Sequence, residues 1–352
     1  MDTTDTAPAL RPRTRTGLPD WAGFVLGVVC ALVGLLPWLL QGMRLPLQNL
    51  WADEVSPDAM PLVALPFSQY SLVLLVSLIV TGSALAGLLL RSVGRPRRAR
   101  GFVLAWAGLL LVQGAATAQT VSEVRPGLSA DSRSDLYFGT ILGVIIASIV
   151  VGLLVAVLVS RAPAPGAALG LTMGALVVDS WLSTLLYAQD GPFRIASPLP
   201  LLEWLSAVLV GAVLAWCGVR SVGRVLAWIV SLFLLWIVPA LFTGIMTAAG
   251  SRVLLRNPRD ALEAAGETFA AALGPAGMSW RYVLVALVIG AVGAVVAGVI
   301  RRRRRPRRRS PAPPARIATT CPPVRGLRRR SLRPLPAHPG DCGGEPGSPP
   351  RS

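Results

Sequence analysis

Asp179 is the residue of this chain whose type and position suggest chemistry most directly. It is the one acidic residue that lies deep within a long apolar stretch. It stands about eight residues from the end of that stretch, which corresponds to roughly 12 Å along a helix. A carboxyl group near the centre of a bilayer costs about 2.5 to 3.5 kcal/mol on insertion scales. A chain that keeps such a group uses it for binding, for coupling or for structure.

Other polar side chains recur at helical spacing and could complete a site with Asp179. Thr172, Asp179 and Ser183 fall on one stripe of a helix, because residues three and four apart lie on the same face. Gln113 and Thr117 stand at a similar expected depth in another apolar stretch. These five residues form the candidate intramembrane polar site.

Three interpretations of this site are open from the sequence. Asp179 can bind a cation, a proton or a cationic substrate. It can also be a protonated acid that is hydrogen-bonded to Ser183 or Gln113 as a structural element. In the third interpretation it forms an ion pair with Arg281, which stands at the end of the last apolar stretch.

The composition places these residues in a membrane protein. The 352 residues are 53% hydrophobic and 14% charged, whereas soluble domains carry about 25% charged residues. This excludes a soluble enzyme and a disordered chain. The apolar residues come in runs of roughly 18 to 25, the length of a membrane-spanning helix.

The apolar runs predict an all-α polytopic membrane protein with about eight transmembrane helices. Residues 1–21 form an N-terminal tail, 22–300 the transmembrane domain and 301–352 a disordered tail rich in Arg and Pro. The expected spans lie near 22–40, 71–90, 102–119, 137–160, 166–186, 201–219, 225–247 and 280–300.

The distribution of Arg predicts the orientation, because positively charged connections stay on the cytoplasmic side. One set of connections carries nineteen Arg and the opposite set eight, while most acidic residues belong to the second set. Both termini are therefore expected in the cytoplasm. The use of Arg without Lys, together with much Ala and Gly, favours a bacterial plasma membrane.

Two short sequence blocks indicate an internal duplication. Arg-Ser-Val-Gly-Arg occurs at 91–95 and again at 220–224, and Val-Leu-Ala-Trp occurs at 103–106 and again at 225–228. Spans one to four would then match spans five to eight in the same orientation, as a parallel repeat. The alternative is that apolar helices with Arg at their inner ends resemble one another by composition.

Small residues are expected to hold the helices together, because lipid gives apolar helices no hydrophobic reason to associate. They recur every four residues in the fourth and last spans, and we expect this stripe to pack within the monomer rather than across a dimer. The stripes are Ser148, Gly152, Ala156 and Ser160, and Ala286, Gly290, Ala294 and Gly298. Pro37 and Pro239 predict kinks.

The two ends of the domain carry further segments. An amphipathic helix is expected to begin near Pro258 and to lie on the outer membrane surface or to cap the bundle. The tail after residue 300 is expected to contact anionic lipid of the inner leaflet, through Arg301, Arg302, Arg303, Arg304 and Arg305. Nucleic-acid binding is disfavoured because no aromatic residue is interleaved with the Arg. A shifted reading frame of a GC-rich gene would give a tail of similar composition.

The sequence lacks the constellations that mark common enzymes, so no catalytic residue, metal ligand or cofactor is predicted. The four Cys have no framework spacing, and neither a phosphate-binding loop nor a nucleophile elbow occurs. Two functions remain. One is a permease-like translocator of a small solute or ion, and the other is a non-catalytic scaffold or regulatory protein of the cell envelope with unknown protein partners.

Overall fold

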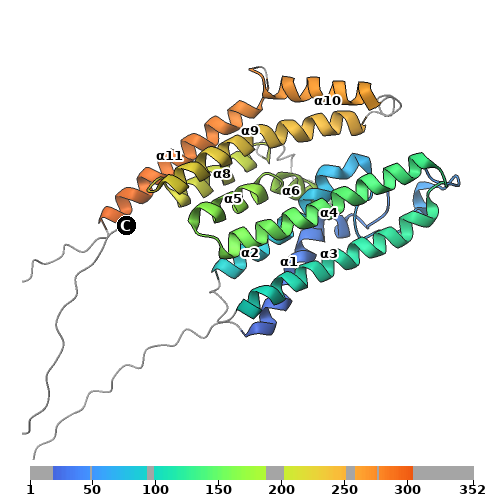
Figure 1. Cartoon of the computed structure of the whole chain (residues 1–352), viewed down its shortest axis with the longest axis horizontal. Helices are drawn as coiled ribbons and strands as arrows, with labels where there is room; N and C mark the ends of the chain where they lie inside the picture. Colours follow the sequence, from blue (N-terminus) through green and yellow to red (C-terminus); the bar gives the residue numbers. More distant parts are fainter. Residues whose placement is uncertain are drawn as a thin grey trace, which may run out of the picture. The chain divides into compact units, whose positions relative to one another are not determined.

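The computed structural model describes residues 19–47, 50–92, 99–187, 202–250, 258–275 and 277–303. These residues belong to one compact unit, and its regular elements are helices (Figure 1). The longer helices are α1 (Asp20–Leu40), α2 (Leu72–Ser92), α3 (Ala99–Gly127), α4 (Ser132–Arg161), α5 (Ala164–Ala175), α6 (Val178–Tyr187), α8 (Leu205–Cys217), α9 (Val222–Gly250), α10 (Pro258–Leu273) and α11 (Ser279–Arg303).

Within the described residues, seven helical segments are long and apolar enough to cross a membrane. They are α1, α2, α3, α4, the combined α5–α6 segment, α9 and α11. The expected span at 201–219 is represented by α8, which has 13 residues. At 1.5 Å per residue this helix measures about 20 Å, less than the roughly 30 Å hydrocarbon core of a bilayer.

Consecutive helices run up and down, so their ends gather at two sides (Figure 1). One side, called here the basic end, holds the beginnings of α1, α3, α5 and α9 and the ends of α2, α4, α8 and α11. The other side, called here the far end, holds the described residues of the segment 41–71, the α3–α4 turn, the end of α9 and the beginning of α10. The described Arg-rich connections therefore lie together.

The first half of the domain, residues 19–161, is built on α1 against α3 and α2 against α4, with α1 also packed on α2. Helices α1 and α3 approach until their backbones touch. A Cβ atom on Gly27 would clash with the carbonyl oxygen of Ala105, and one on Gly108 with the carbonyl oxygen of Phe24. Only glycine allows this contact, which replaces side-chain packing by close backbone packing.

The second half, residues 164–303, uses the same order of packing. Helix α5 packs on α9, α8 packs on α11, and α5 also packs on α8. The expected small-residue stripes lie at these contacts. Gly152 of α4 faces Ser83 of α2, and Gly290 of α11 faces Leu214 of α8. The stripe on α11 stops being packed at Gly298, where no other atom lies within 4 Å of an added Cβ.

The predicted outer amphipathic helix is present as α10, and it packs along α9. Gly244 of α9 is the contact point, since a Cβ there would lie 2.8 Å from the carbonyl oxygen of Ala265. Ala261 is 8% exposed at this interface, whereas Leu262 is 76% exposed. An Ala face therefore mediates the packing, and the helix forms a hairpin with α9.

At the far end of the first half, the segment 41–71 is folded into a cap. Phe67 is fully buried among residues of α1, α2 and α4, and the Trp38 indole N–H donates to the carbonyl of Val63 at 2.8 Å. The hydroxyl of Thr120 accepts the backbone N–H of Leu65 at 3.0 Å. Side chains of α3 thus satisfy backbone groups that a loop would otherwise leave unpaired.

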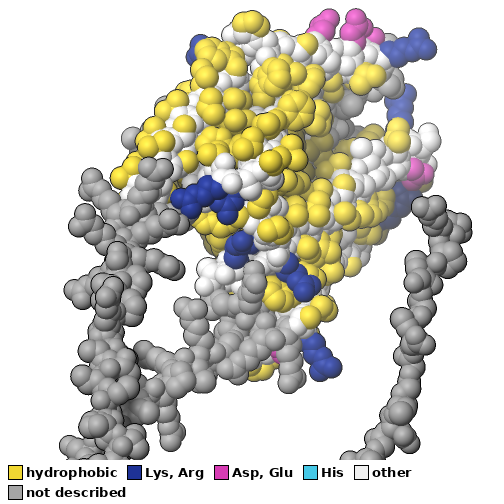
Figure 2. Space-filling view, turned by 60° about the vertical axis from the view of Figure 1, so that its left-hand side comes forward, with side chains coloured by type: hydrophobic (Ala, Val, Ile, Leu, Met, Phe, Trp, Pro, Cys, Tyr) yellow, Lys and Arg dark blue, Asp and Glu magenta, His cyan; other side chains and the backbone are white. Residues whose placement is uncertain are grey.

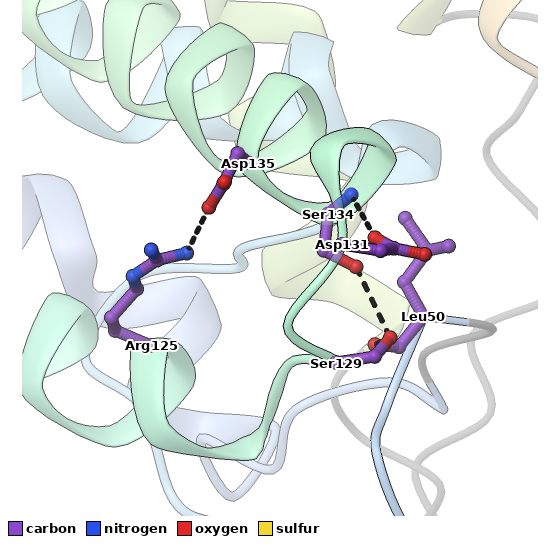
Figure 3. Close-up of polar contacts among 6 residues, drawn as sticks. All are labelled: Leu50, Arg125, Ser129, Asp131, Ser134 and Asp135. Carbon is purple, nitrogen blue, oxygen red and sulfur yellow. Dashed lines mark hydrogen bonds and ion pairs between the residues drawn. The ribbon is translucent and has the colours of Figure 1, made fainter.

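The α3–α4 turn is tied to this cap by the contacts drawn in Figure 3. Ser129 donates its hydroxyl to the carbonyl of Leu50 at 2.8 Å. Asp131 caps α4 by accepting the backbone N–H of Ser134 at 2.7 Å, and this hydrogen bond lowers the pKa of the Asp131 carboxyl. Arg125 and Asp135 form an exposed ion pair at 2.7 Å.

Candidate functional site

Asp179 lies where a membrane-length helix is interrupted. The sequence predicted one continuous span over 166–186, but α5 ends at Ala175 and α6 begins at Val178. Leu176 and Val177 form a turn, with the Leu176 N–H donating to the carbonyl of Thr172 at 3.0 Å. The span predicted over 166–186 is thus present as one membrane-length segment, Ala164–Leu186, with a turn that no Pro marks in the sequence.

The break changes the chemical environment of Asp179. It is a first-turn residue of α6, and its carboxylate accepts the backbone N–H of Ser180. The beginning of a helix leaves four backbone N–H groups without partners inside the helix and carries a partial positive charge. Both effects act in favour of a carboxylate and oppose the cost of burying it.

The α5–α6 segment also connects the two halves. It packs on α1, α2 and α4 of the first half and on α8 and α9 of the second. The Trp181 indole N–H donates to the carbonyl of Gly34 in α1 at 2.8 Å, one turn before Pro37. The break in the second half therefore lies against the Pro-containing region of α1.

The aromatic and acidic neighbours of Asp179 come from the second half. The hydroxyl of Tyr282 at the beginning of α11 interacts electrostatically with Asp179 and with Glu203. The Tyr282 ring also meets the Trp204 ring edge to face, with centroids 5.3 Å apart. Tyr282 and Trp204 are thus in ring contact, and the charges of Glu203 and Asp179 act on the Tyr282 hydroxyl.

The structure separates the other predicted site residues into different contacts. Thr172 is fully buried and donates its hydroxyl to Ser231 of α9 at 2.9 Å. Ser183 donates to the carbonyl of Ser180 within its own helix at 3.0 Å. The stripe expected across the span is thus divided by the turn at Leu176, with Thr172 on α5 and Asp179 and Ser183 on α6.

Gln113 and Thr117 belong to the first half. Gln113 is 3% exposed and donates to the carbonyl of Ile79 and to the hydroxyl of Ser83, both at 3.2 Å. Thr117 donates to the carbonyl of Gln113 at 2.7 Å. Gln113 therefore joins α3 to α2, and its amide N–H groups bond to α2 rather than to Asp179.

Arg281 also has contacts of its own. Its Nη1 donates to the Met278 sulfur at 3.4 Å, and its guanidinium lies 5.7 Å from the centre of the Trp280 ring. The next residue along α11, Tyr282, packs against the Trp204 ring. Adjacent helix positions point about 100° apart, so Arg281 and Tyr282 lie on different sides of α11.

The charges at the two ends follow the pattern expected from the sequence. Figure 2 shows several Arg side chains across the lower part of an apolar surface, and acidic side chains together with further Arg side chains at its top and right. Arg301, Arg302 and Arg303 complete α11 at the basic end. Arg304, Arg305 and the predicted disordered tail to residue 352 lie outside the described residues, as does the predicted N-terminal tail up to residue 18.

Two cavities among the described residues are lined almost entirely by apolar side chains. One, of about 400 Å³, lies among α2, α5 and α8, and Thr81 contributes the hydroxyl group in its lining. Another lies between α9 and α11, beside Trp236 and Trp280. Within the described part of the chain, no three His, Cys, Asp or Glu residues are grouped so that they could hold a metal ion.

Comparison with known proteins gives no family assignment. The chain matches no family model, no curated protein and no solved structure. The functional argument therefore rests on the residues of this chain. Those that the sequence did not indicate are Trp181, Glu203 and Tyr282, since nothing in a linear pattern shows which side of α11 faces the break.

Proposed function

We propose that this protein is a multi-pass plasma-membrane translocator of a small solute or ion, with the α5–α6 break as its binding and coupling element. The observation that carries the proposal is the interruption of a central membrane-length helix beside Asp179. Discontinuous helices place backbone charge at mid-depth, where transporters bind their substrates and coupling ions. The carboxylate would bind a proton or cation there.

The contacts of the segment support a role in conformational change. A two-residue turn joins α5 to α6, and both helices contact each half of the domain. A rearrangement at Leu176 and Val177 would move α6 relative to α5 without unfolding either helix. Coupling between the halves would pass through contacts such as the Trp181 hydrogen bond to Gly34.

A duplicated four-helix unit is part of this proposal. If α5–α6 corresponds to α1, then α8, α9 and α11 correspond to α2, α3 and α4, and the packing order of the two halves agrees. Trp106 and Trp228, which the sequence blocks align, share a further feature. Each indole N–H is buried without a hydrogen-bond partner. Parallel repeats of this kind build several transporter folds.

The proposed orientation places the basic end in the cytoplasm, as the Arg distribution favours. Arg301 to Arg305 would then contact anionic lipid of the inner leaflet. Cysteine introduced in place of Gly274 should react with a membrane-impermeant reagent added outside, and cysteine in place of Arg100 should be protected. Outside labelling at position 100 would contradict this topology.

A non-catalytic scaffold is the second candidate, and the apolar lining of the described cavities favours it. A hydrophilic solute needs a polar path, whereas a scaffold needs a packed bundle and exposed partner surfaces. The folded cap over 41–71, held by Phe67 and Trp38, would serve as such a surface. The two candidates differ in what they require of Asp179.

Asp179→Asn separates them, because the amide keeps the size of the side chain and loses the titratable charge. A translocator should keep its membrane level and thermal stability in detergent but lose the growth or uptake phenotype that distinguishes wild type from a deletion strain. The matched control is Glu263→Gln, which removes an exposed acidic charge on α10, away from the break. Full function of Asp179→Asn would contradict the proposed coupling role.

A further inference from the structure

The groove between α2 and α8 has α5 at its base and is open at the surface. Leu88, Ala212 and Trp216 line it and are exposed. Apart from Thr81 and the Trp216 indole, every side chain in its lining is aliphatic. Water in an apolar space lacks hydrogen-bond partners, so an apolar chain is the better occupant.

The length of the groove matches one leaflet. It begins near Leu88 and Trp216, about one turn from the basic end, and extends to Thr81 and Val178 beside the helix break. Thr81 is ten residues from Arg91 on α2, about 15 Å along a helix, and half of the hydrocarbon core is also about 15 Å. The hydroxyl of Thr81 is buried without a hydrogen-bond partner at the deep end.

A positive charge lies at the mouth of the groove. The Arg91 guanidinium is 5.3 Å from the centre of the Trp216 ring, and its Nη1 donates to the carbonyls of Val159 and Ala162 at 2.8 and 2.9 Å. These two bonds hold the side chain in place. The N–H groups of Nη2 and Nε are left to donate to a ligand. Arg220 and Arg224 follow α8 at the same end, and the connections 91–101 and 217–224 contain no acidic residue.

We propose that this groove binds an anionic phospholipid, with one acyl chain between α2 and α8 and the phosphate at Arg91. A guanidinium with free N–H groups is suited to phosphate oxygens through charge-assisted hydrogen bonds. The aliphatic lining recognises the chain, and the fixed Arg91 recognises the headgroup. The site is separate from the basic tail, and it does not depend on the proposed translocation.

The test compares nanodiscs of phosphatidylcholine with nanodiscs that also contain phosphatidylglycerol. Melting temperature and native mass spectrometry report stabilisation and retained lipid. The wild type should melt higher with phosphatidylglycerol and retain one molecule of it. Ala212→Trp fills the groove, and Arg91→Gln removes the charge. Each variant should bind phosphatidylglycerol at least about tenfold more weakly than wild type, which corresponds to 1.4 kcal/mol of binding free energy.

Two controls separate lipid binding from general damage. Val288→Trp adds the same bulk on the exposed face of α11, and Arg100→Gln removes another charge at the basic end; both should behave as wild type. Arg91→Lys keeps the charge and should keep part of the effect even if Arg91→Gln fails to fold. Unchanged retention by Ala212→Trp would overturn the groove assignment, and equal stabilisation by phosphatidylcholine alone would overturn the requirement for an anion.

Discussion

In the first half of the domain α1 continues through Pro37, whereas in the second half the helix with the corresponding contacts is divided into α5 and α6. The first half is closed at its far end by the cap over 41–71, which buries Phe67 and Trp38. In the second half Asp179 lies in the first turn of α6, directly after the turn that divides the helix. One packing scheme thus includes a half with a continuous first helix and a half in which the corresponding helix is divided beside an acidic residue.

The two halves differ in the groups that bind their backbone N–H and C=O groups near these positions. In α1, which is continuous through Pro37, the Gly34 carbonyl receives the Trp181 indole N–H. In α6 the Asp179 carboxylate accepts the backbone N–H groups of Ser180 and of Asp179 itself. A proton or cation that binds this carboxylate would compete with those backbone bonds, which links ligand binding to the shape of the turn.

The largest expected effect is on the backbone contact of the first half. Gly27→Leu would place a side chain against the Ala105 carbonyl, where no flexible group can yield. We expect a loss of about 3 kcal/mol, the upper part of the usual range for overpacking, measured as thermal stability in detergent. Gly114→Leu on α3 is the control because no atom lies within 4 Å of an added Cβ there, and equal damage by both would refute the close contact.

The packing order shared by the halves predicts matched effects at α2–α4 and α8–α11. Gly152→Val and Gly290→Val should each destabilise by about 1–3 kcal/mol, because Ser83 and Leu214 respectively occupy the space. Gly298→Val, on the same stripe of α11, should be neutral. Damage in one half alone would show that the two interfaces are not equivalent.

A smaller effect is expected for one buried hydrogen bond in each half. Double-mutant cycles of Thr172→Val with Ser231→Ala, and of Gln113→Leu with Ser83→Ala, should each give a coupling free energy near 0.6 kcal/mol, typical of membrane hydrogen bonds. Both pairs are buried, with separations of 2.9 and 3.2 Å. A coupling of zero for either pair would contradict the corresponding hydrogen bond.

The smallest effect concerns pH at the α3–α4 turn. The Ser134 N–H stabilises the ionised form of Asp131 and lowers its pKa, so the cap adds stability above the unfolded pKa of about 3.9. That stability should decline as the pH falls through the lower folded pKa. Melting curves of wild type should therefore approach those of Asp131→Asn only under acid conditions below about pH 4, whereas a pH-independent difference would contradict the charged cap.

Hydropathy predicted the helical membrane class and most of the helix positions, because membrane spans require long apolar runs. It placed α3 at 102–119, whereas the helix covers 99–127, since polar residues such as Gln119 and Thr120 continue the helix and bond to the cap. The sequence also identified Asp179. The break before Asp179 was not predictable from hydropathy, because Leu176 and Val177 are as apolar as a continuous helix would require.

The partners of Asp179 depended on this break. Helical spacing grouped Thr172 with Asp179, but Thr172 bonds to Ser231 of α9, and the Asp179 carboxylate accepts the backbone N–H of Ser180. Likewise Gln113 was expected beside Asp179, yet it bonds to Ser83. Hydropathy predicts which residues fall within an apolar helix, whereas the direction of a side chain around the helix axis requires the packing of the neighbouring helices.

Accessibility of position 179 to water tests the translocator most directly. In a variant whose native cysteines are replaced, Asp179→Cys should react with a membrane-impermeant thiol reagent added to either side, because an alternating site opens to each side in turn. Ser148→Cys, at a position that is 4% exposed on α4, should stay unreactive from both. Labelling of position 179 from one side only, or from neither, would contradict the proposed function.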